Sequence, residues 1–164
     1  MIKLVLGLGS NVGNRVRWLK KAVSEICSLP GFNFKALSPI YETEPWGFKE
    51  QKKFLNCVLV CNCSLAPADA LKVLKQTEKL LGRQYRGKWK QREIDIDLLF
   101  FDDKIIKKGK LVIPHPFLHE RNFVLKPLAD IMPGYIHPVL HRTIKYLYSH
   151  SPDSGKLKLF LRKI

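Results

Sequence analysis

The stretch Arg92–Phe101, REIDIDLLFF, places two carboxylates in a segment that is otherwise apolar and typical of a β-strand. Side chains alternate between the two faces of a strand, so Asp95 and Asp97 are expected to point the same way, together with Leu99. Their Cα atoms would be about 6.5–7 Å apart. The opposite face is predicted to be apolar and consists of Ile94, Ile96 and Leu98.

Two carboxylates at this spacing can bind one or two hard cations, and Mg²⁺ keeps coordination positions open for phosphate oxygens. The alternative is that both acids form ion pairs with Arg83 and Arg92 in the basic loop that precedes the strand. The spacing alone leaves both interpretations open.

That loop, residues 82–93 (GRQYRGKWKQRE), is rich in basic side chains. Arginines beside a carboxylate pair suit a site in which Mg²⁺ and guanidinium groups together neutralise a polyphosphate. A solvated basic face is the alternative. The whole chain has 29 Lys and Arg against 14 Asp and Glu, a formal charge of +15, which indicates polyanionic partners.

Phosphate-binding glycine motifs do not explain the charge, because the sequence has no Walker A pattern. Gly7 and Gly9 lack the third glycine and the downstream acid of a dinucleotide fingerprint. We predict instead that they form a turn from a first strand into a helix.

Hydrophobic periodicity predicts strands near residues 2–8, 32–38, 54–63 and 94–101. It also predicts a helix of about 15 residues capped by Asn14, and a second helix from Pro67 that stops at Gly82. The order strand-helix-strand-strand-helix-strand is typical of a ferredoxin-like α+β sandwich. We expect a single domain over residues 1–164, with a C-terminal extension that contains a helix near residues 143–149. Residues 151–164 could be a helix, a strand or a solubilising tail.

The cysteines and the absence of long apolar runs predict a cytoplasmic protein that does not enter the membrane. No apolar run approaches the eighteen or so residues that span a bilayer. Cys57, Cys61 and Cys63 alternate along one strand and, like Cys27, are predicted to be reduced structural thiols.

Seven blocks, in order, resemble the signature of the 6-hydroxymethyl-7,8-dihydropterin pyrophosphokinase family and extend from residue 7 to about residue 128. They are GLGSNVGNR, YETEPWG, FLN, EKLLGR, REIDIDLLFFDD, IPHP and ERNFVLKPL. The resemblance implies a ferredoxin-like fold and transfer of diphosphate from ATP to the hydroxymethyl group of the pterin. AMP would be released, and the product would enter folate biosynthesis.

The resemblance also implies the site residues. Asp95 and Asp97 would coordinate two Mg²⁺ ions, and Arg83 and Arg92 would act with them in catalysis. The implied pterin-binding residues are Thr43, Glu44, Trp46, Phe54, Asn56, Asp95 and Phe123. The implied ATP-binding residues are Glu78, Arg83, Arg86, Trp89, Arg92, Leu98, Lys110, His115 and Arg121. Without the resemblance, the phenylalanines would be assigned to the core and Asn56 to the surface.

Some positions depart from the family pattern. Relatives usually have WGPR where this chain has WKQR at residues 89–92, and the loop is one residue shorter than in some of them. The family pattern has a second arginine in this loop. Either Tyr85 or Arg86 occupies its position in this chain, and we favour Arg86 for its charge. Lys110 replaces an arginine and loses the bidentate fork. Val112 replaces a residue that is often polar.

Two other functions fit part of the sequence. A ferredoxin-like sheet with aromatics and positive charge also describes RNA-binding modules, but an unmetallated aspartate pair would repel phosphates. A two-metal nuclease or nucleotidyltransferase shares the paired aspartates but has no need of a pterin pocket. We expect small-molecule substrates, no nucleic acid and no membrane partner, and a monomer with a homodimer as the alternative.

Overall fold

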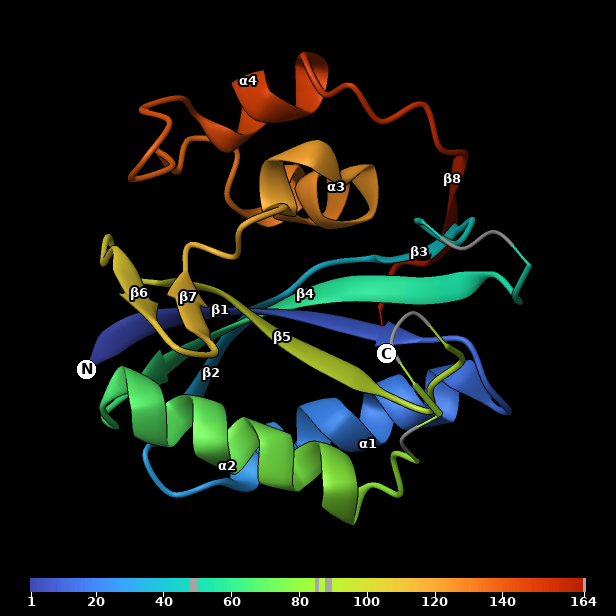
Figure 1. Ribbon diagram of the computed structural model, residues 1–164, viewed down its shortest axis with the longest axis horizontal. Coiled ribbons are helices and arrows are strands. Elements are labelled where there is room, and N and C mark those ends of the chain that lie inside the picture. Colours follow the sequence, from blue (N-terminus) through green and yellow to red (C-terminus); the bar gives the residue numbers. More distant parts are fainter. Residues whose placement is uncertain (48–49, 85, 88–89, 164) are drawn as a thin grey trace.

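The computed structural model describes residues 1–47, 50–84, 86–87 and 90–163, which form three layers (Figure 1). A β-sheet lies in the middle. Helices α1 (Arg15–Ser28) and α2 (Pro67–Leu80) cover one face. On the other face, α3 (Asn122–Ile131) packs on the sheet and α4 (Ile144–Ser149) packs on α3. A short 3₁₀ helix, η1 (Leu118–Glu120), precedes α3 in the chain. The fold is therefore α+β.

Six strands form the main sheet, in the order β5–β1–β4–β3–β8, and β2 pairs with β4. All of the pairings between the strands of this sheet are antiparallel. A separate hairpin consists of β6 (Ile106–Lys108) and β7 (Leu111–Ile113). The strands of the main sheet are β1 (Ile2–Ser10), β2 (Phe32–Leu37), β3 (Ile40–Thr43), β4 (Phe54–Cys63), β5 (Asp95–Phe101) and β8 (Leu157–Leu161).

Strands β2 and β3 pair with the same edge of β4, one after the other. The Ser38 N–H donates to the carbonyl of Val58 at 2.9 Å, and Val58 N–H donates to Ser38 Oγ at 2.9 Å. These bonds continue the pairing across the interruption at Ser38 and Pro39. The sequence predicts a Pro- and Gly-punctuated loop at residues 38–53 (SPIYETEPWGFKEQKK), which is wrong for β3, because a four-residue strand that follows a proline carries too little periodicity to be recognised.

Each face of the sheet carries its own hydrophobic cluster. Ile94, Ile96 and Leu98 lie in the cluster under α1 and α2, as predicted, and Leu99 lies in the cluster under α3 and α4. Three of the cysteines are buried in the first cluster, and Cys27 packs against it; all four are free thiols, as expected. The carboxylates of β5 therefore face the α3 side of the sheet.

The predicted helix ends are confirmed. Asn14 caps α1 by accepting a hydrogen bond from Arg17 N–H at 3.0 Å, and Gly82 follows α2 with φ +88°. The prediction that Gly7 and Gly9 form a turn is wrong, because β1 continues through Ser10. Gly13, with φ +60°, lies in the turn instead.

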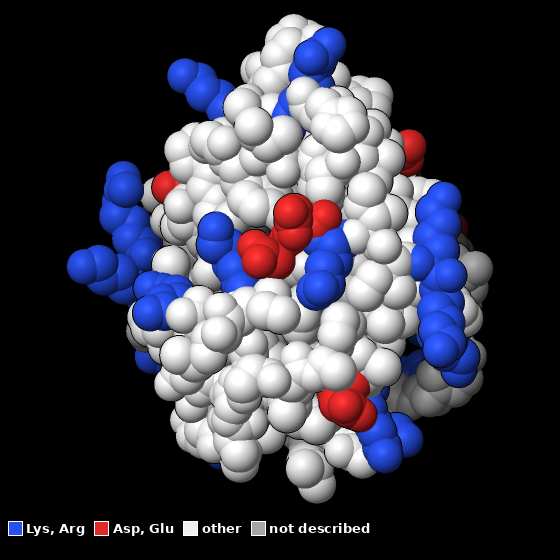
Figure 2. All heavy atoms as spheres, turned by 90° about the vertical axis from the view of Figure 1, so that its left-hand side faces the viewer, with Lys and Arg blue, Asp and Glu red and all other residues white. Residues whose placement is uncertain are grey.

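Residues Leu157–Leu161 form β8 beside β3, so the tail contributes a strand. On the face shown in Figure 2, basic side chains gather at the left and right edges, and acidic side chains occupy the centre with a basic side chain on either side. The centre of this face is therefore of mixed charge, and the positive charge is concentrated toward its edges. None of the described helices is long and apolar enough to cross a membrane.

Candidate active site

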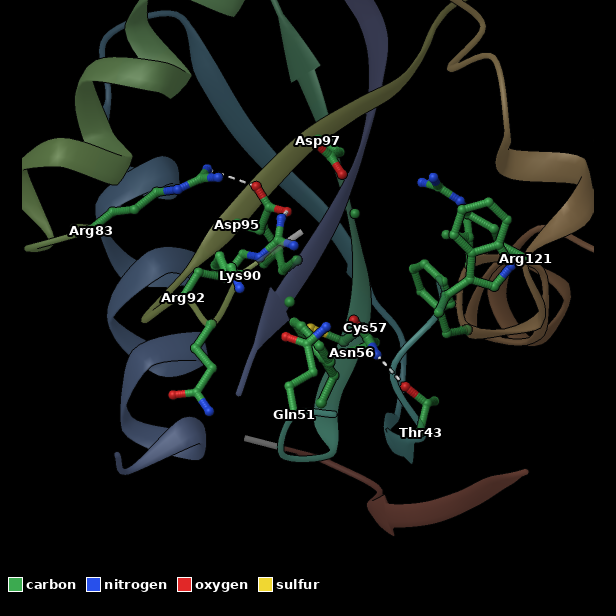
Figure 3. A pocket seen from close by; sticks show the side chains of 18 of the residues that line it. Thr43, Gln51, Asn56, Cys57, Arg83, Lys90, Arg92, Asp95, Asp97 and Arg121 are labelled. Carbon is green, nitrogen blue, oxygen red and sulfur yellow. Dashed lines mark hydrogen bonds and ion pairs between the residues drawn. The ribbon is translucent and has the colours of Figure 1, made fainter. Parts of the chain in front are cut away.

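A cavity of about 490 Å³ lies over the α3 side of the sheet (Figure 3). Its floor comes from β1, β4 and β5, and its walls come from the end of β3, the start of α3 and the loop that follows α2. The cavity contains both aspartates of the REIDIDLLFF stretch. Strand pairing therefore gathers residues that lie far apart in the sequence.

Two glycines of β1 keep the floor of the cavity open. Gly7 lies opposite Asp97 and Gly9 lies opposite Asp95 in the register of β1 and β5. A Cβ atom at Gly9 would lie 2.8 Å from Asn56 Oδ1, which is closer than real Cβ contacts allow. A Cβ at Gly7 would meet only Leu99, at an ordinary 3.5 Å. Glycine is thus required at position 9 for the position that Asn56 adopts.

Asp95 is held by two arginines from the basic loop. Its carboxylate accepts hydrogen bonds from Arg83 Nη1 at 2.7 Å and from Arg92 Nη1 at 2.5 Å. Burial alone would raise the pKa of Asp95, but the charges of Arg92 and Arg83 keep it below its ordinary value. Asp95 is therefore ionised, as in the ion-pair interpretation of the sequence.

Asp97 is in a different electrostatic environment. Its side chain is 39% exposed, and Lys75 Nζ lies 3.8 Å from its Oδ1. Burial within the cavity, and then repulsion by the Asp95 carboxylate, raise the pKa of Asp97 to about 7. A cation bound here would relieve the repulsion.

Glu78 connects α2 to β5 behind the two aspartates. Its Oε1 accepts hydrogen bonds from Ile96 N–H at 2.6 Å and from Lys75 Nζ at 2.8 Å, and its Oε2 pairs with Arg83 Nη1 at 2.5 Å. The Glu78 side chain is only 5% exposed. Glu78 therefore fixes the position from which Arg83 reaches Asp95.

An aromatic wall lies across the cavity from the aspartates. The Arg121 guanidinium is buried and lies over the rings of Trp46 (4.3 Å), Phe117 (5.2 Å) and Phe123 (5.7 Å). On the other side, the Arg92 guanidinium lies 5.6 Å from the ring centroid of Phe54. Figure 3 shows Asp97 between Asp95 on one side of the cavity and Arg121 on the other. The cavity thus combines guanidinium groups with flat apolar surfaces.

A buried amide supplies the polar edge of this wall. Asn56 Nδ2 donates a hydrogen bond to Thr43 Oγ1 at 2.7 Å, and both side chains are buried. The bond fixes the orientation of the Asn56 carboxamide beside the Phe54 ring, on the strand face that the alternation of β4 predicts. The amide can then offer its carbonyl oxygen to the edge of a bound heterocycle.

The structure brings most of the predicted site residues into this one cavity. The predicted residues that line it are Thr43, Glu44, Trp46, Phe54, Asn56, Arg83, Arg86, Arg92, Asp95, Asp97, His115, Arg121 and Phe123. Three predicted residues do not line it: Glu78 is buried between α2 and β5, Leu98 is buried in the cluster under α1 and α2, and Lys110 is exposed on the turn between β6 and β7. Trp89 lies outside the described residues, as does the alternative Tyr85.

Arg86 and His115 also line the cavity, and each has a defined environment. Arg86 pairs with Glu93, with 2.5 Å between Nη2 and Oε1, and this contact lowers the pKa of Glu93 to about 2. His115 lies at the cavity after β7, and burial lowers its pKa to about 4. His115 is therefore neutral at pH 7 and can act as a hydrogen-bond donor or acceptor.

Sequence reasoning missed several residues that line the cavity, above all Gly7, Gly9 and Lys75. Lys75 precedes the predicted Glu78 by three residues, and this helical spacing placed it on the same face of α2. The role of Gly9 could not be found in the same way, because it depends on pairing with both β4 and β5.

Asp95 and Asp97 fit Mg²⁺ as two carboxylate ligands whose coordination is completed by waters and substrate phosphates. Among the described residues, no group of three or more His, Cys, Asp or Glu side chains could hold a metal ion. Mg²⁺ is nevertheless commonly bound by one or two carboxylates together with waters and substrate phosphates. Asp95 and Asp97, with the like-charge repulsion that raises the pKa of Asp97, fit a cation that arrives with a phosphorylated substrate.

The fold and the cavity together define an α+β protein whose main sheet carries a pocket suited to an anionic and an aromatic ligand. A sequence model of 7,8-dihydro-6-hydroxymethylpterin-pyrophosphokinase (HPPK) matches residues 5–133. The chain belongs to this family.

Relatives of similar length support the assignment. The chain is 42% identical over 145 residues to the 2-amino-4-hydroxy-6-hydroxymethyldihydropteridine pyrophosphokinase of Aquifex aeolicus, covering 88% of this chain and 89% of the relative. It is 40% identical over 136 residues to the protein of the same name from Methylorubrum extorquens, covering 83% and 86%.

Other matches are to longer proteins. The chain is 37% identical to the folic acid synthesis protein FOL1 of Dictyostelium discoideum, over 93% of this chain but 23% of that protein. The crystal structure of Plasmodium falciparum HPPK-DHPS with pteroate superposes on 90% of this chain and 42% of its own, with a TM-score of 0.75 and 19% identity. This likeness shows the fold.

Proposed function

We propose that this protein transfers diphosphate from ATP to the hydroxymethyl group of 6-hydroxymethyl-7,8-dihydropterin, giving AMP and the pterin diphosphate in folate biosynthesis. Its membership of the HPPK family supports this activity. The observation that carries the proposal is that one cavity contains an acidic pair, several arginines and an aromatic wall with a fixed amide. A triphosphate and a flat heterocycle need these features side by side.

Asp95 and Asp97 would hold Mg²⁺ in this reaction, and we propose two ions. When bound, Mg²⁺ would neutralise the phosphates of ATP and reduce their repulsion of the incoming hydroxyl oxygen. Asp95 is ionised already, because two arginines contact it. The raised pKa of Asp97 favours its protonated form, and binding of the cation would displace that proton.

Arg83 and Arg92 would hold the triphosphate and stabilise the charge that develops on it during transfer. Both guanidinium groups are positioned before any ligand arrives, Arg83 by Glu78 and Asp95, and Arg92 by Asp95. A donor that is already oriented needs little reorganisation in the transition state. Arg86, His115 and Arg121 line the same cavity and would contact the remaining phosphate oxygens. Glu78, Leu98, Lys110 and Trp89 remain predicted nucleotide contacts.

Phe54 and Phe123 would stack on the two faces of the pterin, since both rings line the cavity. Asn56 would bind the polar edge of the heterocycle, with Thr43, Glu44 and Trp46 beside it. The hydrogen bond between Asn56 and Thr43 supports this role, because it fixes which way the carboxamide points. A nuclease or an RNA-binding module would have no evident use for such a slot.

We further infer a ferredoxin-like arrangement. Its successive elements would be β1, then α1, then β2 and β3 together as one strand position, then β4, α2 and β5. The antiparallel strand order β5–β1–β4 with β2 and β3 on the far edge supports it. Helices α3 and α4 and strand β8 would be the C-terminal extension of a single domain over residues 1–164. The cytoplasmic location and the monomeric state, with a homodimer as the alternative, remain predictions from the sequence.

The experiment that tests the activity measures AMP by chromatography after incubating the purified protein with ATP, Mg²⁺ and 6-hydroxymethyl-7,8-dihydropterin. We expect AMP only when both the pterin and Mg²⁺ are present. Parallel reactions contain single-stranded RNA or DNA in place of the pterin. Absence of pterin-dependent AMP, or cleavage of nucleic acid, would contradict the proposal.

A further inference from the structure

The C-terminal segment at residues 151–161 contacts both walls of the aromatic half of the cavity. This segment lies outside residues 5–133, the part that matches the family. Figure 1 shows it descending from α4 to the outer edge of the sheet, where β8 pairs with β3. The segment therefore joins the helix layer to the sheet.

Asp153 of this segment caps helix α3. Its Oδ2 accepts a hydrogen bond from Asn122 N–H at 2.7 Å, and its backbone carbonyl accepts one from Asn122 Nδ2 at 2.6 Å. Helix α3 has no side-chain cap of its own at Arg121. A carboxylate at this position satisfies a free N–H and interacts favourably with the helix dipole.

The carboxylate of Asp153 is itself held in place. Its Oδ1 accepts a hydrogen bond from Gly155 N–H at 2.8 Å, and Ser151 Oγ accepts one from Asp153 N–H at 3.2 Å. The carboxylate thus reaches α3 from a folded turn of the tail.

The residue that Asp153 binds lies between two residues of the cavity. Arg121 and Phe123 both line the cavity, and Asn122 separates them at the start of α3. Fixing the Asn122 backbone therefore fixes the direction in which the Phe123 ring enters the cavity.

The same segment also binds the opposite wall. In β8, Leu157 pairs with Thr43 and Lys158 pairs with Glu42. Thr43 accepts the hydrogen bond that orients Asn56. A second cavity of about 310 Å³ lies where the tail, the end of β3 and the start of α3 meet, and it shares Thr43 and Phe123 with the first.

We propose that Asp153 is a positioning residue for the pterin slot, which is the part of the cavity between Phe123 and the wall formed by Thr43 and Asn56. Through its cap on α3 and the pairing of β8 with β3, the tail sets the distance between Phe123 and the wall formed by Thr43 and Asn56. A flat heterocycle requires a defined separation between its two walls, because contact on both faces is lost when they move apart. This inference rests on the proposed function only in that the proposed function names the pterin as the ligand.

The test compares Asp153→Ala with Asp69→Asn. Asp69 is exposed in the first turn of α2, so its loss removes a carboxylate from the N-terminal turn of a helix away from the cavity. Calorimetry measures the Kd of a non-hydrolysable ATP analogue with Mg²⁺, and then the Kd of the pterin in its presence. We expect Asp153→Ala to weaken pterin binding by up to about fivefold, because the free energy of one helix cap sets the upper limit, and to leave the Kd of the ATP analogue unchanged. Asp69→Asn should change neither.

Hydrogen exchange supplies a second measurement that needs no ligand. The amides at residues 122–125 should exchange faster in Asp153→Ala than in the native protein, whereas the α2 amides should not. If Asp153→Ala fails to fold, Asn122→Ala replaces it, because this change removes only the bond from Nδ2 to the Asp153 carbonyl. Asn122→Ala should show the same selective effects in a weaker form.

The outcomes separate this inference from the proposed function. A folded Asp153→Ala protein with native pterin affinity and native exchange at residues 122–125 would overturn the inference. Equal weakening of ATP-analogue and pterin binding would overturn it too, because that result indicates a general loss of structure. A native protein that binds no pterin would contradict the proposed function, while the exchange measurement would still test the role of Asp153.

Discussion

Gly9 of β1 lies opposite Asn56 of β4, and the space that a Cβ atom would occupy at Gly9 lies 2.8 Å from Asn56 Oδ1. The position of the Asn56 carboxamide therefore depends on the absence of a side chain on the neighbouring strand. Gly7, two residues earlier, is a natural control, because the atoms nearest to a Cβ there would belong to Leu99, at an ordinary 3.5 Å.

Gly9→Ala should weaken pterin binding at least tenfold, because an Asn56 amide that moves by a few tenths of an ångström no longer meets the edge of the ring. Gly7→Ala should bind pterin within about threefold of the native protein. Calorimetry in the presence of an ATP analogue measures both. Equal pterin affinities for the two variants would show that Asn56 does not recognise the pterin.

Replacement of Arg83 or Arg92 by Ala should lower kcat by about 100-fold, equivalent to about 3 kcal/mol for one preorganised donor. Arg83→Ala should also destabilise the fold, because it leaves the buried Glu78 carboxylate without one partner. Steady-state kinetics and thermal unfolding separate the two effects. Arg17→Ala, an exposed change on α1, is the matched control for loss of positive charge. A kcat within threefold of native for both variants would exclude the proposed role.

Asp97→Asn should reduce turnover by more than 1,000-fold and leave the fold intact or slightly more stable. The amide removes the like-charge repulsion with Asp95 that raises the pKa of Asp97. AMP formation and thermal unfolding without Mg²⁺ provide the two measurements. Turnover within about tenfold of native would mean that Asp97 is not a metal ligand.

His137 makes the stability of the fold depend on pH, away from the cavity. Its side chain is 4% exposed, and burial lowers its pKa to about 4, whereas the unfolded chain has an ordinary value near 6.5. Its contribution is complete above pH 6.5 and is lost as the pH falls toward 4, because only the unfolded chain takes up the proton in this range. The loss amounts to at most about 3 kcal/mol.

His137→Asn should therefore have a flatter dependence of unfolding free energy on pH between 7 and 4. Asparagine can still accept hydrogen bonds from Val139 and Leu140 N–H, as His137 Nδ1 does now. Urea unfolding at several pH values measures the difference. Parallel curves for the two proteins would show that His137 does not titrate in this way.

The sequence predicted those parts of the fold that local patterns encode. β4 and its two faces follow from strict alternation, and the ends of α1 and α2 follow from Asn14 and Gly82. The short β3 and the tail strand β8 could not be predicted, because each is stabilised mainly by pairing with the other and, for β3, with β4.

The candidate site shows the same division. The resemblance supplied thirteen of the residues that line the cavity, but it could not show that two arginines bind Asp95 or that Lys75 Nζ lies 3.8 Å from Asp97 Oδ1. The two interpretations of the acidic pair are therefore not exclusive. Asp95 forms the ion pairs and still has free lone pairs on its two oxygens for a cation, and Asp97 retains the exposure that a metal ligand needs.

We propose that Asp95 and Asp97 together bind the divalent ions that accompany ATP. Electron paramagnetic resonance of Mn²⁺, titrated into the protein with a non-hydrolysable ATP analogue, tests this binding when native protein is compared with Asp97→Asn. We predict two Mn²⁺ ions per native chain and the loss of at least one in the variant, with the analogue still bound. The same number of ions bound with the same affinity in both proteins would contradict the account.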